Sequence, residues 1–192
     1  MMTLAQKGGG HVGSDWGAWM MRIRALIVGC AAGAFLLGAF FGASAQAQQP
    51  TQPTPPPDYG VPITLDQAKE AATAAQAEAK KNGWRMAIAV VDPGGYLVYF
   101  ERTDGTQNAS IALAEAKART SALFRRPSKV FADQFAAGNT GFMSFPNEAR
   151  PIASEGGIPI VINGKLIGAI GASGGSGQQD GVAATAGATA VK

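Results

Sequence analysis

The stretch IPIVINGKLIGAIGAS, residues 158–173, decides the fold. Two runs rich in β-branched and other apolar residues flank Asn163-Gly164, a dipeptide typical of two-residue hairpin turns. A second pair of such runs lies in RMAIAVVDPGGYLVYFERTDG, residues 85–105, around the turn residues 92–95. Because an isolated hairpin is marginally stable in water, we expect the two hairpins to join into one antiparallel sheet.

A helical pattern precedes the first hairpin, in ITLDQAKEAATAAQAEAKKNG, residues 63–83. Thr64 is placed to cap this helix, and Gln67 stands at the third helical position, which together form a capping box. Gly83 is placed to end the helix. The alanines provide a narrow apolar stripe for packing on the sheet.

Further helical patterns follow each hairpin. We expect a helix in NASIALAEAKARTSALF, residues 108–124, with Asn108 or Ser110 as its cap, and a shorter helix over 128–138 beyond Pro127. Residues 139–157 have little periodicity, and the residues after Asp180 form a last, alanine-rich helix. The order α–β–β–α–α–β–β–α predicts an α+β domain in which an antiparallel sheet built from two hairpins is flanked by helices.

Residues 1–47 have the features of a presequence. Arg22 and Arg24 precede an apolar run over 25–41, and small residues spaced as A-x-A follow it, which is the pattern of a secretory signal peptide. The alternative is a membrane anchor, but the apolar run is shorter than the ~20 residues of a spanning helix. We therefore expect export to the periplasm or the outside, with contact to a membrane only through an uncleaved signal. Cleavage is expected after Ala45 or Ala47, and Met1, Met20 and Met21 are the candidate start residues.

Cleavage changes the chemical inventory of the chain. The single histidine, His11, and the single cysteine, Cys30, both leave with the presequence. The mature chain then excludes a cysteine or histidine nucleophile, a Ser–His–Asp triad, disulfides and most zinc sites. From residue 48 onward there are 13 basic and 12 acidic residues, a net charge of +1, which gives no electrostatic case for nucleic-acid binding. Residues 48–60 form a proline-rich linker, and 61–192 form one domain.

The glycine-rich stretch GAIGASGGSGQQDGVAATAG, residues 168–187, fits neither of the common nucleotide-binding fingerprints. Two interpretations remain open. The glycines allow close backbone approach and turn the chain, or the N–H groups of Gly174, Gly175 and Ser176 bind an anionic group at the start of the following helix. Asp180 weighs against a purely anionic ligand, because its carboxylate would cap that helix itself.

The helix over 108–124 carries an unusual stripe, since Leu113, Lys117, Thr120 and Phe124 fall on one face. Lys117 either snorkels to solvent or lies in a cleft, where it meets a carboxylate and Thr120 donates a hydrogen bond. Just beyond the helix, three basic side chains cluster, either as a solvated run or as a carboxylate site: Arg125, Arg126 and Lys129. Glu115 and Arg119 are expected to form a solvated ion pair, and we recognise no catalytic constellation.

Three of these stretches, taken together, resemble the GlcG/HbpS family of haem-binding or "haem-degrading" domains: SIALAEAKARTSALF, GGIPIVINGKLIGAIGASGG and QDGVAATAG. The resemblance covers residue 61 to the C-terminus. It implies an α+β domain that assembles into dimers or larger homo-oligomers, and its secreted members are haem sensors or scavengers. The resemblance assigns the walls of a shared cleft to two motifs: Ala114, Lys117, Ala118 and Thr120 on the helix, and Gly156, Gly157, Pro159, Gly168, Gly171, Ser173, Gly174 and Asp180 in the glycine motif.

Some haem-binding relatives use a histidine, which the mature chain lacks. The resemblance therefore implies weak or unusual haem ligation, in which the iron is held without a strong axial ligand or by one of seven candidates: Tyr59, Tyr96, Tyr99, Met86, Met143, Lys117 and Thr120. Tyr96, Tyr99 and Met86 are the main candidates among them. Lys117 and the basic residues at 125, 126 and 129 would meet the haem propionates.

Three hypotheses follow. The first is an exported, non-catalytic protein that binds haem or a related tetrapyrrole. The second is an enzyme or accessory factor for a small hydroxy- or keto-acid resembling glycolate, held by Lys117 and the 174–176 loop. The third is a structural homo-oligomer without a ligand, in which the alanines at 114, 118 and 122 form close helix–helix contacts.

Overall fold

The computed structural model describes residues 55–192 of the chain. The predicted presequence, with its signal peptide and cleavage sites, lies outside the described residues and stays a prediction. The elements, in chain order, are β1 (Asp58–Tyr59), α1 (Leu65–Lys81), β2 (Ala87–Val91), β3 (Leu97–Arg102), α2 (Ala109–Phe124), α3 (Lys129–Ala136), the 3-10 turns η1 (Gly141–Ser144) and η2 (Asn147–Ala149), β4 (Gly157–Ile162), β5 (Lys165–Ser173) and α4 (Gly177–Ala190).

The two predicted hairpins are present and share one sheet. β2 pairs antiparallel with β3, β4 pairs antiparallel with β5, and β2 joins the two hairpins by pairing antiparallel with β5. The turn between β4 and β5 places Asn163 and Gly164 at φ values of 51° and 75°, as the Asn-Gly dipeptide predicts. The α+β class is confirmed.

One strand was not predicted, because it lies in the segment assigned to the proline-rich linker. β1 pairs in parallel with β5, with Asp58 opposite Lys165 and Tyr59 opposite Leu166. The sheet is therefore mixed, and the prediction of a wholly antiparallel sheet is wrong in this detail. The reason is that β2 covers only one half of β5, which leaves hydrogen-bonding groups in the other half for a short extended segment.

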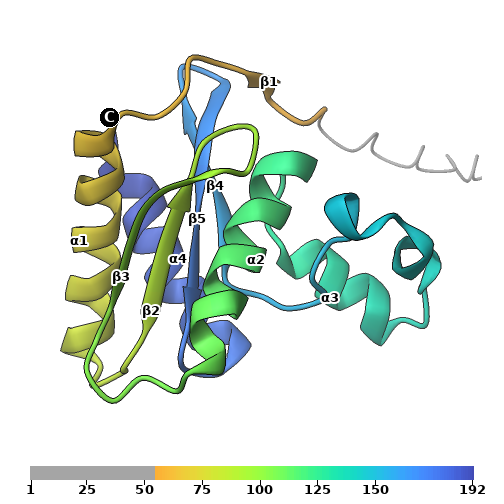
Figure 1. Ribbon diagram of the computed structural model, residues 1–192. Helices are drawn as coiled ribbons and strands as arrows, with labels where there is room; N and C mark the ends of the chain where they lie inside the picture. The colour runs from red at the N-terminus through yellow and green to blue at the C-terminus, as the bar shows by residue number, and fades with distance from the viewer. Residues whose placement is uncertain (1–54) are drawn as a thin grey trace, which may run out of the picture. The chain divides into compact units, whose positions relative to one another are not determined.

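Helices cover both faces of the sheet (Figure 1). α1 and α4 pack against each other on one face, and α2 crosses β2, β4 and β5 on the other. The capping box of α1 is formed by Thr64 and Gln67, as predicted. α3, η1 and η2 form a lobe beyond α2 (Figure 1). No helix within residues 55–192 is long and apolar enough to span a membrane.

Small residues bring α2 close to the sheet. The side chains of Ala114, Ala118 and Ala122 are fully buried against small residues of β2 and β5. A Cβ at Gly171 would collide with the carbonyl oxygen of Ala114, so this position requires glycine. The alanine stripe that suggested helix–helix contact between subunits therefore packs inside the domain, so these three side chains are not available for such a contact, and assembly into a homo-oligomer stays a prediction.

Candidate functional site

Helix α2 positions two neighbouring environments, of which the first is a buried ion pair. The Lys117 ammonium lies 2.6 Å from Oδ2 of Asp180, the fourth residue of α4, and it also donates to the carbonyl oxygen of Ala172 on β5 at 3.2 Å. The Lys117 side chain is only 2% exposed. The interpretation that Lys117 snorkels to solvent is therefore wrong, and the carboxylate that it meets belongs to the protein.

The other oxygen of Asp180 is also occupied, because Oδ1 accepts a hydrogen bond of 2.9 Å from the backbone N–H of Gly175. Burial raises the pKa of the Asp180 carboxyl above its ordinary value, and this effect exceeds the opposing effects of Lys117 and of the N–H groups of Gly175 and Gly174. Ser176 caps α4 in a capping box with Gln179, so the expected capping role of Asp180 falls to Ser176.

Glycines enclose this ion pair. A Cβ at Gly157 would collide with the backbone carbonyl of Lys117, and a Cβ at Gly156 would lie 2.7 Å from the Asp180 Cβ. We call this region the glycine junction. It consists of Lys117, Asp180, Gly156, Gly157 and residues 172–175, where β5 ends. It ties α2, β5 and α4 together, and its two charged groups satisfy one another. Gly174 and Gly175 also border a polar hollow of about 510 Å³ beside Arg85 and Gln179.

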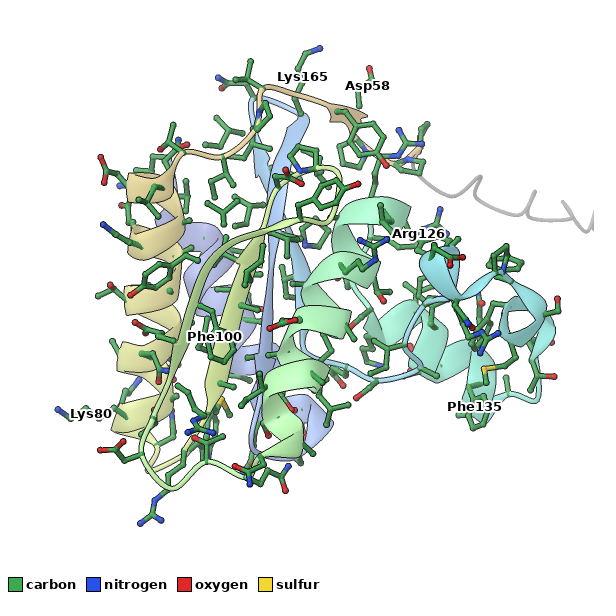
Figure 2. The ribbon with its side chains drawn as sticks, viewed as in Figure 1. Asp58, Lys80, Phe100, Arg126, Phe135 and Lys165 are labelled. Carbon is green, nitrogen blue, oxygen red and sulfur yellow. The ribbon has the colours of Figure 1, made fainter. Side chains whose placement is uncertain are left out.

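The second environment is a cavity of about 620 Å³, which we call the α2 cavity. It lies between α2 and the irregular segment that ends at β4. Its lining is mainly apolar and comes from α2, α3 and the connection between α3 and β4: Ala116, Arg119, Thr120, Leu123, Phe124, Phe135, Met143, Asn147, Arg150, Pro151, Ile152 and Ala153. Figure 2 shows Phe135 on the lobe beyond α2. A cavity of this volume, with an apolar wall and few polar groups, suits a small organic ligand.

Two arginines supply the positive charge of the α2 cavity. Arg119 donates to the carbonyl oxygens of Glu148 at 2.9 Å and Gly95 at 3.4 Å, and Arg150 donates to the carbonyl oxygen of Phe145 at 3.2 and 3.3 Å. The ion pairs among residues 55–192 are Lys81–Glu78, Lys117–Asp180 and Lys129–Asp133, so neither arginine is neutralised by a carboxylate there. The expected pair between Glu115 and Arg119 does not form.

Thr120 is the predicted site residue that lies in the α2 cavity. Its Oγ1 accepts a 3.0 Å hydrogen bond from the backbone N–H of Ile152, which holds the connection against α2. An aromatic cluster supports the same wall: the rings of Phe124 and Phe131 are 4.7 Å apart, and those of Phe131 and Phe142 are 5.6 Å apart. The wall is therefore a packed structure, although its sequence has little periodicity.

The three basic residues after α2 do not form one cluster. Arg125 donates to the carbonyl oxygen of Pro57 at 3.1 Å and lies over the Tyr59 ring, which secures β1. Arg126 donates to the carbonyl oxygen of Phe124, near the C-terminal end of α2 (Figure 2). Lys129 pairs with Asp133 on α3 at 2.5 Å. These three residues do not form a single propionate site, because each side chain binds a different partner in the domain.

The predicted iron ligands also lie apart from one another. Met86 is fully buried in the core, and Tyr96 lies in the β2–β3 turn and is 72% exposed. The Tyr99 hydroxyl donates to the Glu101 carboxylate at 3.1 Å. This hydrogen bond raises the pKa of the Tyr99 hydroxyl, and the charge of Glu101 and burial add to the effect. None of the three lines the α2 cavity. No group of three or more metal-binding side chains was found in residues 55–192.

Sequence reasoning missed most of the α2 cavity. Arg119 was assigned to a surface ion pair, and Arg150 lies in the segment treated as an irregular connection, whereas Met143 of that segment was named only as a candidate iron ligand. The composition of the segment could have indicated the cavity wall, because residues 142–153 contain two phenylalanines, a methionine, an arginine and two prolines within twelve positions.

A largely apolar cavity with a few polar groups in its lining is the usual form of a small-molecule-binding site, and the α2 cavity of this α+β domain has that form. The sequence pattern of the family described as "Haem degrading protein HbpS-like" matches residues 63–189, and the chain belongs to this family. The resemblance stated from the sequence is thereby confirmed.

Individual relatives agree with this assignment. Protein GlcG of Escherichia coli K12 is 37% identical over 111 residues, which cover 58% of this chain and 81% of GlcG. The crystal structure of a double mutant of Streptomyces reticuli HbpS is 28% identical, has a TM-score of 0.63, and covers 85% of this chain and 99% of its own. The crystal structure of a PduOC–haem complex superimposes with a TM-score of 0.63, and its sequence is 25% identical. The match covers 69% of this chain and 96% of the PduOC chain.

Proposed function

We propose that this chain is an exported, non-catalytic protein that binds haem or a related tetrapyrrole in the α2 cavity. The observation that carries the proposal is the pairing of an apolar wall with Arg119 and Arg150, neither of which has a carboxylate partner among the described residues. The structural similarity to PduOC, whose crystal structure is that of a haem complex, supports haem as the ligand.

The residues of the α2 cavity fit the chemistry of haem. The macrocycle is flat and apolar, and Leu123, Phe124 and Ile152 offer an apolar surface for it. The two propionates are carboxylates, and arginine is the side chain that binds carboxylates most specifically. Thr120 and Ile152 hold the two sides of the cavity together through one hydrogen bond. When bound, haem would supply the iron and the visible absorption of the complex.

The test is a titration of the full chain with ferric haem, followed by absorbance. We expect a saturable complex with a shifted Soret band. In Arg119→Gln/Arg150→Gln the affinity should fall by about tenfold or more, because a hydrogen bond to a charged group contributes about 1.5–3 kcal/mol. Arg85→Gln is the matched control, since Arg85 lies outside the α2 cavity and its replacement should leave the affinity unchanged. A spectrum identical to that of free haem would contradict the proposal.

A second candidate is an enzyme or accessory factor for a small hydroxy- or keto-acid. The two arginines of the α2 cavity favour it, since together they suit one carboxylate, whereas the buried Lys117 does not reach a ligand. Titration with glycolate distinguishes the two ideas. The acid is the ligand if three results agree: glycolate binds to the original protein, the Arg119→Gln/Arg150→Gln variant no longer binds glycolate, and the protein leaves the absorption spectrum of haem unchanged.

A further inference from the structure

The α2 cavity contains one side chain with a soft donor atom, the thioether of Met143. The chain has one histidine and one cysteine, at positions 11 and 30, and neither lies in residues 55–192. The two methionines of that range differ in position. Met86 is fully buried in the core between the sheet and α1, whereas Met143 lines the cavity and is 46% exposed. Met143 is therefore the methionine of residues 55–192 whose side chain borders the cavity and is accessible to solvent.

The backbone around Met143 is fixed. In η1 the N–H of Met143 donates to the carbonyl oxygen of Thr140 at 2.9 Å, and the Ser144 hydroxyl donates to the carbonyl oxygen of Gly141 at 2.8 Å. The preceding residue, Phe142, is buried with its ring against Phe131. The buried ring of Phe142 holds the η1 turn in place, and the side chain of the following residue, Met143, borders the cavity.

Other donor atoms in the α2 cavity are less suited to iron. The guanidinium groups of Arg119 and Arg150 are positively charged and have no lone pair to donate. The Thr120 hydroxyl already accepts the N–H of Ile152, and no tyrosine lines the cavity. The Asn147 amide is a hard, neutral oxygen donor. The thioether of methionine, by contrast, is an established axial ligand of haem iron.

We propose that the thioether of Met143 would be a ligand to the iron of a haem bound in the α2 cavity. This inference rests on the proposed function. A lone pair of Sδ forms the coordinate bond, and no proton or electron is transferred. Arg119 and Arg150, on other parts of the cavity lining, would face the propionates. A thioether ligand favours the ferrous state and raises the reduction potential of the iron.

The experiment compares the full chain with Met143→Leu, which conserves the volume of the side chain. Three readouts are used: the ferric and ferrous absorption spectra, the midpoint potential, and the proton NMR spectrum of the ferrous complex with added carbon monoxide, which makes the iron low-spin and diamagnetic. In the original protein we expect a methionine methyl resonance shifted strongly upfield by the haem ring. In Met143→Leu this resonance should be lost, the midpoint potential should fall, and ferrous haem should bind about tenfold more weakly.

Met143→His is the second variant, because an imidazole at this position should restore strong ligation with the spectrum of a histidine complex. If Met143→Leu binds haem with an unchanged spectrum and potential, the inference about Met143 is overturned while the proposed function stands. If the original chain leaves the haem spectrum unchanged, both fail. Loss of the upfield resonance in Met143→Leu, together with the imidazole spectrum in Met143→His, supports the inference.

Discussion

The glycine junction and the α2 cavity lie on the same helix, yet they treat charge in opposite ways. At the junction, Lys117 and Asp180 are buried and satisfy each other at 2.6 Å. At the cavity, Arg119 and Arg150 bind only backbone carbonyl oxygens and border a space of about 620 Å³. A charge that is matched inside the fold stabilises the fold, whereas a charge without a matching carboxylate beside a cavity is available to a ligand.

The comparison separates stability from binding. Substitutions at the glycine junction should cost stability, and substitutions of the cavity arginines should cost affinity with little change in stability.

Removing Lys117 should have the largest effect. In Lys117→Met the buried Asp180 carboxylate loses its counter-ion, and breaking a buried ion pair in this way typically costs about 3–5 kcal/mol. Urea denaturation at neutral pH measures this cost. The double variant Lys117→Met/Asp180→Leu removes both charges and should recover part of the loss. A single variant as stable as the original protein would contradict a structural role for the pair.

The cost of Lys117→Met should depend on pH. Burial already raises the pKa of Asp180, and removing the ammonium raises it further. A carboxyl whose pKa is higher in the folded than in the unfolded state contributes stability below its unfolded pKa, and this contribution is lost as the pH rises through the folded pKa. The difference in the free energy of unfolding between the original protein and Lys117→Met should therefore become smaller as the solution is acidified. Denaturation curves of both proteins between mildly acidic and neutral pH test this, and a constant deficit would argue against a buried carboxylate.

Gly157→Ala should have the next largest effect, since a Cβ there would meet the backbone carbonyl of Lys117. Overpacking of this kind costs about 1–3 kcal/mol. Gly141→Ala is the matched control, because a Cβ at that position meets no atom within 4 Å. Thermal unfolding of the two variants should show a lower Tm for Gly157→Ala alone. Equal Tm values would mean that α2 and β4 are not packed as closely as described.

Arg150→Gln should have the smallest effect on stability. Arg150 is exposed, and surface substitutions of this kind usually change the free energy of unfolding by less than about 0.5 kcal/mol. Urea denaturation without ligand should therefore give nearly the original midpoint. A large loss of stability would place Arg150 in the structural framework rather than in a binding site.

The sequence predicted the fold well where local chemistry decides it. The Asn163-Gly164 turn, the 92–95 turn and the capping box of Thr64 and Gln67 all formed as expected, because each depends on residues close in the chain. β1 was missed because its pairing with β5 joins segments more than 100 residues apart. Nothing near Asp58 indicates that β5 has an unpaired half.

The site was harder to predict, because a sequence does not show which charges meet. Lys117 and Asp180 were both singled out as ligand-binding residues. They lie 63 positions apart, and only the fold reveals that they bind each other. Thr120 lines the α2 cavity, but its Oγ1 accepts a hydrogen bond from Ile152 where the sequence suggested a donor to a ligand. The opposite wall comes from a segment whose packing depends on aromatic contacts with α2 and α3. Gly174, Gly175 and Ser176 remain predicted ligand-binding residues that no observation tests.

The most direct test of the account is to locate the ligand by NMR. The full chain, labelled with ¹⁵N, would be titrated with zinc protoporphyrin, a diamagnetic analogue of haem. If the ligand occupies the α2 cavity, the amide signals of residues 119–124 and 143–153 should shift on binding, while those of residues 172–175 and Asp180 in the glycine junction stay in place. Shifts confined to residues 172–175 and Asp180, with residues 143–153 unchanged, would contradict the account and would make the glycine junction the binding site.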